Sequence, residues 1–130
     1  MSLDLHGHSG KENLFFYGCQ GIAGMYEVRQ LPTIMCRLSD AFSYKSCCYY
    51  IQEDRLGTAR VALARDFRGL SYTLETSVMG SSLTVSHFQQ KDYMELGREL
   101  IKGLAIYRSL SVVADHMLFS AKFTKKALMN

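Results

Sequence analysis

The chain has 130 residues, 48% of them hydrophobic and 21% charged, which is ordinary for one globular domain. Fifteen basic against twelve acidic side chains leave a formal charge of +3, which is too small to predict a nucleic-acid-binding protein. Four cysteines without a signal peptide do not predict a secreted disulfide scaffold. The sequence contains no run of about 18 apolar residues, which is the length that predicts a membrane span.

The first half of the chain predicts strands and one helix. A short alternating run predicts a strand over 3–6, and the apolar run at 14–17 fits either a buried strand or one helical turn. Pro32 suits the first position of a helix, and apolar residues follow it at helical spacing, which predicts a helix over 32–42. Aromatic and apolar residues predict a further strand over 47–52.

The second half predicts two more strands and a long helical end. The strands are expected at 59–64 and 70–76, and the poor alternation of the first is typical of a strand buried on both faces. An amphipathic helix is predicted from Asp92, with an end or bend near 109–111 and further helix over 112–126. Short strands with helices between and after them indicate an α/β or α+β fold.

The first candidate site lies where the first predicted strand ends. His6 stands two residues after Asp4, and a histidine beside a carboxylate can be a metal ligand that the carboxylate orients. The alternative is a polar pair without a metal. A catalytic zinc site needs three protein ligands, and neither His87 nor His116 has a carboxylate at helical ligand spacing. If His6 binds a metal, its partner ligands are therefore not in an obvious motif.

Two charged residues on predicted strands are further candidates. Glu75 lies near the end of an apolar strand, where a dry site would suit a general base and a wet one would make it an ordinary surface carboxylate. Arg60 lies in a run that looks buried, so its charge needs a partner. That partner is either an acid of the chain, such as Asp54, Asp66 or Glu75, or an acidic ligand.

Three motifs in order carry a family resemblance. Residues 4–9 read Asp-Leu-His-Gly-His-Ser and are followed by Phe-Tyr-Gly-Cys at 16–19; residues 58–61 read Thr-Ala-Arg-Val; residues 71–75 read Ser-Tyr-Thr-Leu-Glu. Together they resemble the zinc carboxypeptidases, and specifically the cytosolic carboxypeptidase family, which trims glutamates from tubulin and other protein tails. The resemblance extends over residues 4–108.

The resemblance implies a fold and a role for each candidate. It implies an α/β fold, with residues 1–130 forming a single partial domain: the C-terminal half of a zinc-carboxypeptidase-like mixed sheet flanked by helices. His6 would be the third zinc ligand, and Glu75 the catalytic carboxylate that moves a proton from water to the leaving amine. Arg60 would pair with a glutamate side chain at the floor of the pocket. Zinc is the implied cofactor, acidic C-terminal tails are the implied partners, and the cytoplasm is the implied location.

The sequence also departs from the family pattern. The His-x-x-Glu motif that supplies two zinc ligands, and the Asn-Arg pair that grips the substrate carboxylate, lie upstream in the family and are not found here. We therefore expect part of a larger enzyme that has no activity and little zinc affinity by itself. The alternative is a non-catalytic module that holds acidic tails through Arg60. An incomplete sheet exposes a strand edge and an apolar face, which predicts self-association.

Overall fold

The structure, a computed structural model, describes residues 1–84 and 86–127. Two short 3-10 turns, Tyr44–Ser46 and Glu53–Arg55, lie in the connection before the second helix. The strands and helices in chain order are β1 (Ser2–His8), β2 (Leu14–Tyr17), α1 (Glu27–Leu38), α2 (Ala59–Phe67), β3 (Ser71–Ser77) and α3 (Gln90–Ala127).

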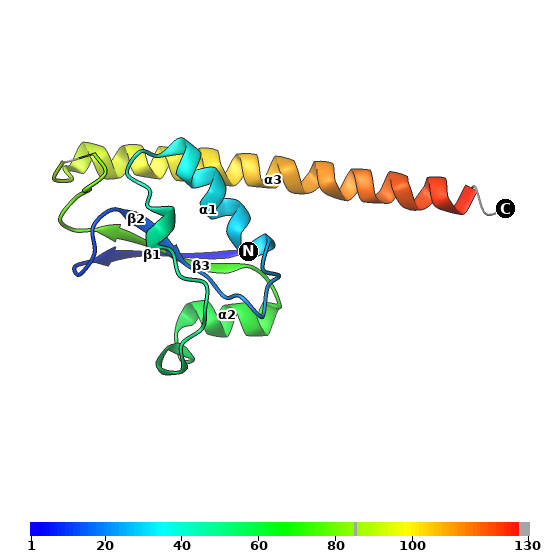
Figure 1. Ribbon diagram of the computed structural model, residues 1–130, viewed down its shortest axis with the longest axis horizontal. Coiled ribbons are helices and arrows are strands. Elements are labelled where there is room, and N and C mark those ends of the chain that lie inside the picture. Colours follow the sequence, from blue (N-terminus) through cyan, green and yellow to red (C-terminus); the bar gives the residue numbers. More distant parts are fainter. Residues whose placement is uncertain (85, 128–130) are drawn as a thin grey trace.

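The three strands form one mixed sheet in the order β1-β3-β2. β3 is central, parallel to β1 and antiparallel to β2. Figure 1 shows α1 and α3 on one face of this sheet and α2 on the other. A parallel pair needs a crossover between its strands, and the chain from β2 to α2 provides it. The predicted class, a mixed α/β fold with flanking helices, is confirmed.

The main core lies between the sheet and the two helices α1 and α3. Alternate residues of β2 and β3 point into it, because successive strand side chains face opposite sides of a sheet. Gly103 lets α3 approach α1 closely, since a Cβ there would stand 2.6 Å from the sulfur of Met35. The fully buried core side chains are Leu14, Phe16, Val28, Leu31, Met35 and Tyr72.

Helix α1 begins earlier than the sequence predicts. It spans Glu27–Leu38, so the expectation of a helix over 32–42 that starts at Pro32 is wrong, and the proline lies inside the helix. Proline has no N–H to donate to the carbonyl four residues before it. Here that carbonyl belongs to Val28, and the hydroxyl of Tyr72 donates to it at 3.1 Å. A tertiary hydrogen bond thus replaces the missing helical one.

Residues 59–64 are helical, and the predicted strand there is wrong. They open α2, whose buried residues Arg60, Val61 and Ala64 share one helical face. Thr58 precedes the helix in an extended conformation, and Arg68 ends it in the left-handed region with φ of 45°. The consequence for function is that Arg60 extends from the first turn of a helix and not from a strand.

The predicted strand over 47–52 is also wrong. Cys48 makes one isolated bridge with Tyr17, in which its N–H donates to the carbonyl of Phe16 at 3.0 Å and its carbonyl accepts from Gly18 at 2.9 Å. The segment lies between two 3-10 turns and adds one more backbone hydrogen bond, from Gln20 N–H to the carbonyl of Tyr49 at 2.8 Å, without forming a strand. The other two predicted strands are confirmed, since 3–6 lies in β1 and 70–76 overlaps β3. Of the two alternatives for 14–17, a buried strand or one helical turn, the strand is the one observed, as β2.

Helix α3 continues through the predicted end or bend near 109–111, so that expectation is wrong. The hydroxyl of Ser109 donates to the carbonyl of Ala105 at 3.0 Å, which accommodates a serine inside the helix. α3 runs well beyond the sheet (Figure 1). Within the residues that the structure describes, no helix combines the length and the apolarity that crossing a bilayer requires.

Candidate functional site

The face of the sheet that turns away from α1 and α3 carries the candidate residues. Alternation along β1 places Asp4 and His6 on one face, and alternation along β3 does the same for Thr73 and Glu75. The register pairs Asp4 with Thr73 and His6 with Glu75. Two adjacent parallel strands therefore bring an imidazole and a carboxylate side by side, although 68 residues lie between them in the sequence.

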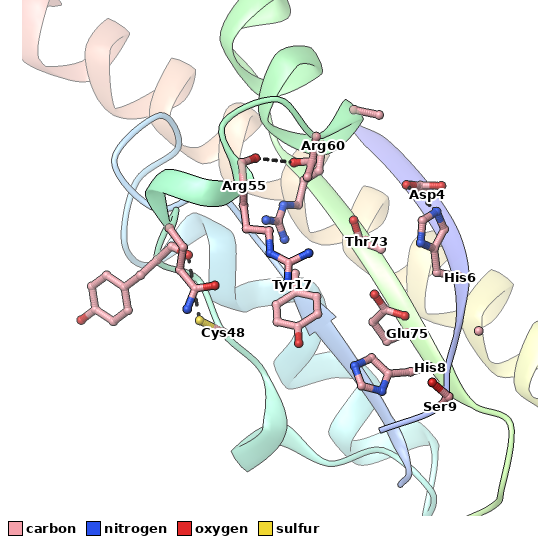
Figure 2. A pocket seen from close by; sticks show the side chains of 15 residues that line it. Asp4, His6, His8, Ser9, Tyr17, Cys48, Arg55, Arg60, Thr73 and Glu75 are labelled. Carbon is pink, nitrogen blue, oxygen red and sulfur yellow. Dashed lines mark hydrogen bonds and ion pairs between the residues drawn. The ribbon is translucent and has the colours of Figure 1, made fainter. Parts of the chain in front are cut away.

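These side chains line a cavity of about 530 Å³. The sheet forms one wall, and the chain from Cys48 to the first turn of α2 forms the opposite wall (Figure 2). The three residues that the sequence singles out, His6, Arg60 and Glu75, all line this one cavity. The structure thus brings together residues that come from three separate motifs.

His6 is held by its neighbour on the same strand. Its Nε2 lies 3.1 Å from Oδ2 of Asp4, and 56% of the side chain is exposed. When Nε2 donates its proton to the carboxylate, Nδ1 keeps a lone pair that can bind a metal. A metal-bound histidine that is oriented by a carboxylate has this arrangement.

Glu75 is nearly enclosed in the middle of the sheet. Only 8% of the residue is exposed. It lies between His6 on β1 and Phe15 on β2, its register partners on the two sides. Because Phe15 is fully buried, one side of the carboxylate is apolar, while the cavity opens on the other. A molecule that enters the cavity would therefore meet this carboxylate.

Arg60 is a buried cation. Only 6% of it is exposed, and its guanidinium carbon lies 5.4 Å from the centroid of the Tyr17 ring. Among the described residues its Nε has no hydrogen-bond partner, and no acidic side chain forms an ion pair with it. A buried charge without a counter-ion is costly. Of the two partners considered from the sequence, an acid of the chain or an acidic ligand, the described part of the chain supplies no acid.

Cys19 packs beneath this arginine. It is almost fully buried, and its thiol lies 3.8 Å from the backbone carbonyl of Arg60. Burial raises the pKa of the Cys19 thiol, and the nearby positive charge of Arg60 only partly opposes this. The protonated thiol therefore does not provide the counter-ion that Arg60 lacks.

The side chains of the cavity provide one ligand of a metal site, His6. Nδ1 of His6 fits a zinc ligand, but a catalytic zinc takes three protein ligands. Among the residues whose side chains the structure describes, no group of three or more histidine, cysteine, aspartate or glutamate side chains is placed to hold a metal ion. His6 alone does not make the site, so further ligands would have to come from outside this set.

Several cavity residues were given no role from the sequence, although two of them, His8 and Tyr17, lie in the motifs that carry the resemblance. His8 continues the row of Asp4 and His6 on β1, and Thr73 precedes Glu75 by two residues, so strand alternation is a signal that could have identified both. Tyr17 and Arg55 reach the cavity from β2 and from the turn before α2. Tyr17 belongs to the motif at 16–19, but no local pattern marks Arg55, and only the tertiary fold brings the two residues to the cavity.

Comparisons with known sequences identify relatives. The chain is 37% identical over 112 residues to cytosolic carboxypeptidase 3 of Bos taurus, a match that covers 80% of this chain and 11% of that protein. It is 38% identical over 100 residues to cytosolic carboxypeptidase 2 of Homo sapiens, covering 72% of this chain and 11% of that protein. No family model matches the chain. The resemblance to the cytosolic carboxypeptidases is confirmed, and the chain spans only 11% of the length of these two relatives.

A comparison with solved structures identifies the fold. A metallo-carboxypeptidase from Burkholderia cenocepacia superimposes with a TM-score of 0.68 at 17% sequence identity. The match covers 83% of this chain and 30% of that one. The mixed sheet and its helices therefore have the arrangement found in part of a metallo-carboxypeptidase fold.

Proposed function

We propose that this chain, a sequence relative of the cytosolic carboxypeptidases, forms the part of a metallo-carboxypeptidase domain that carries the catalytic carboxylate. The proposed reaction is hydrolysis of the last peptide bond of a protein tail that ends in glutamate, such as a tubulin tail. The proposed location is the cytoplasm, which the names of the relatives support. The proposal treats residues 1–130 as one partial domain, because the relatives and the structural neighbour are longer.

The observation that carries the proposal is the register pairing of His6 with Glu75 beside one cavity. In the proposed reaction Glu75 accepts a proton from the attacking water as the new carbon–oxygen bond forms. It then passes that proton to the leaving amine as the carbon–nitrogen bond breaks. The enclosed position of Glu75 suits this task, because a carboxylate shielded from bulk water keeps the transferred proton within the site.

Zinc is the proposed cofactor, with Nδ1 of His6 as one ligand and Asp4 holding the ring through Nε2. When bound, zinc supplies Lewis acidity that polarises the scissile carbonyl and activates water. One imidazole cannot provide the roughly 10 kcal/mol or more typical of tight zinc sites. We therefore expect the 130-residue chain alone to bind little zinc and to have no peptidase activity.

We propose that Arg60 binds the side chain of the terminal residue that hydrolysis releases. Its buried guanidinium has no acidic partner in the described part of the chain, and the side chain of a terminal glutamate would supply one. A charge-assisted pair inside this cavity favours an acidic residue over a neutral one. The neighbouring ring of Tyr17 holds the guanidinium in place.

A second function is a non-catalytic module that binds acidic tails. The observation that favours it is that the buried Arg60 can bind an acidic side chain without any metal ligand. Both functions require Arg60 to bind an acidic side chain, but only the enzyme requires His6 and Glu75. Variants of these two residues therefore distinguish the functions.

A graft tests the enzymatic proposal. In the bovine relative, this chain replaces the segment it matches, and release of the last residue is measured on peptides that end in glutamate or alanine. We expect glutamate release, and a fall of roughly 1,000-fold in the Glu75→Gln graft, within the range of general-base catalysis. Equal turnover in the Glu75→Gln graft would refute the catalytic role. An inactive graft that still folds and binds glutamate tails would favour the binding module.

A further inference from the structure

The ring of His8 has a fixed hydrogen-bonding direction. Its Nδ1 accepts backbone N–H groups from Gly10 at 3.0 Å and from Lys11 at 2.9 Å. A neutral histidine that accepts at Nδ1 carries its proton on Nε2, so Nε2–H is a donor. The ring also packs edge-on against Phe15, with centroids 5.3 Å apart. The hydrogen bonds at Nδ1 and the packing on Phe15 therefore hold this ring, and the loop leaves the Nε2–H donor free.

His8 and Arg60 lie on opposite sides of Glu75. His8 is the register partner of Ser77, two residues beyond Glu75. Arg60 lies over Tyr17, whose register partner is Thr73, two residues before Glu75. Thr73 and Ser77 are four residues apart along β3, so His8 and Arg60 lie beside positions of the strand that are about 13 Å apart. Figure 2 shows the same order, with Glu75 between the arginine and the histidine.

The positive charge of Lys11 lies close to this histidine. Its backbone is bound to the His8 ring, and its ammonium lies 5.0 Å from the Phe15 centroid and 3.4 Å from the Tyr17 hydroxyl. Among the described residues no carboxylate forms an ion pair with Lys11. The loop after β1 thus places a fixed N–H donor and an unpaired cation beside the same aromatic pair.

We propose that His8 and Lys11 form a second acidic subsite, which binds the side-chain carboxylate of the residue before the terminal glutamate. The inference rests on the proposed function. If the terminal side chain is bound at Arg60 and its peptide bond lies at Glu75, the preceding residue leaves the cavity past His8. The subsite therefore selects tails with two consecutive acidic residues over tails with one.

Matched variants separate this role from loop support. In His8→Asn, the side-chain oxygen can take the place of Nδ1 and still accept the backbone N–H groups of the loop, but the donor at the position of Nε2 is lost. In His8→Gln, the side-chain amide can stand where Nε2 lies and still donate. Lys11→Met removes the charge and keeps an apolar stem for packing on Phe15 and Tyr17.

The experiment titrates the purified chain with short peptides that end in Glu-Glu or Ala-Glu, followed by NMR of the backbone amides. We expect the Glu-Glu peptide to bind roughly tenfold more tightly, as a hydrogen bond to a charged group allows. This preference should fall to within about twofold in His8→Asn and in Lys11→Met, while the affinity for Ala-Glu stays the same. His8→Gln should keep more of the preference than His8→Asn.

The outcomes separate the second subsite from the proposed function. Equal affinities of the native chain for both peptides would overturn the second subsite, as would a full preference in His8→Asn. If both peptides bind equally and both are lost in Arg60→Met, only the second subsite fails. If the native chain binds neither peptide, the acidic pocket at Arg60 fails as well.

Discussion

Arg60 lies over the ring of Tyr17, with 5.4 Å between the guanidinium carbon and the ring centroid. In the described part of the chain, however, its buried Nε has no hydrogen-bond partner. The aromatic ring attracts the cation but does not replace a carboxylate. Arg60 therefore costs stability in the free protein, as expected of a residue that is placed to bind an anion.

Replacing Arg60 should separate binding from stability. In Arg60→Met, the apolar stem is kept and the uncompensated charge is removed, so the free energy of unfolding should stay the same or rise by about 1 kcal/mol. Binding of a glutamate-terminated peptide should fall at least tenfold. Thermal unfolding and peptide titration measure the two effects. Arg65→Met, on the exposed side of α2, is the control and should change neither. A loss of several kcal/mol in Arg60→Met would show that the arginine supports the fold instead.

Tyr72 and Pro32 should be energetically coupled. Tyr72→Phe leaves the carbonyl of Val28 without the hydroxyl donor, which should cost about 1–3 kcal/mol. In a Pro32→Ala background, the new N–H of residue 32 can donate to that carbonyl, so the same change should cost less. Urea unfolding of the two single variants and the double variant measures the coupling. An equal cost of Tyr72→Phe in both backgrounds would contradict this explanation of the proline.

The protein should lose stability at alkaline pH. Burial raises the pKa of the thiols of Cys19 and Cys47 and of the hydroxyls of Tyr49 and Tyr72. The unfolded chain loses these protons near pH 8.5 for cysteine and 10 for tyrosine, while the folded chain keeps them. Stability is therefore full below about pH 8 and falls as the pH rises, because the unfolded state then binds fewer protons.

Tm measured from pH 7 to 11 tests this expectation. In Tyr49→Phe, a buried hydroxyl that has no hydrogen-bond partner among the described residues is removed. Tm of this variant should be at least that of the native chain at pH 7, and it should fall less steeply above pH 9. A Tm that does not change across this range in the native chain would contradict the burial of these groups.

The chain should self-associate in solution. β1 is an edge strand in the described sheet, and Leu5 on it is exposed. Ile106, Leu110 and Val113 form an exposed apolar row on the projecting part of α3. We expect Leu5→Lys and Leu110→Lys to shift the sedimentation coefficient toward that of the monomer, most clearly when combined. A native chain that remains monomeric at millimolar concentration would refute this expectation.

The sequence predicts the strands of the site better than the helix that faces them. Alternation identifies β1 and β3, and the resemblance of their motifs to the cytosolic carboxypeptidases implies that His6 and Glu75 belong to one site. The run from Ala59 to Ala64 has no clear period, because Arg60, a charged residue, occupies the buried face of α2 with Val61. Its helical state depends on packing, since Val61 and Ala64 contact Cys19 in a small core of their own.

The start of α1 and the contacts at the rim of the cavity could not be predicted either. Pro32 inside a helix depends on the hydroxyl of Tyr72, which is 40 residues away in the sequence and therefore outside any local pattern. The approach of Tyr17 to Arg60 likewise depends on the packing of β2 beside α2. Local sequence identifies the chemical groups, but the packing decides which of them meet.

The most direct measurement compares zinc content and glutamate release in two variants of the grafted bovine relative. If His6 is a ligand and Glu75 is the carboxylate that moves the proton, His6→Ala should lose zinc and activity together. Glu75→Gln should keep one zinc ion per protein and lose activity. Full zinc content and activity in His6→Ala, or unchanged turnover in Glu75→Gln, would contradict the assignment of this pair as parts of one hydrolytic site.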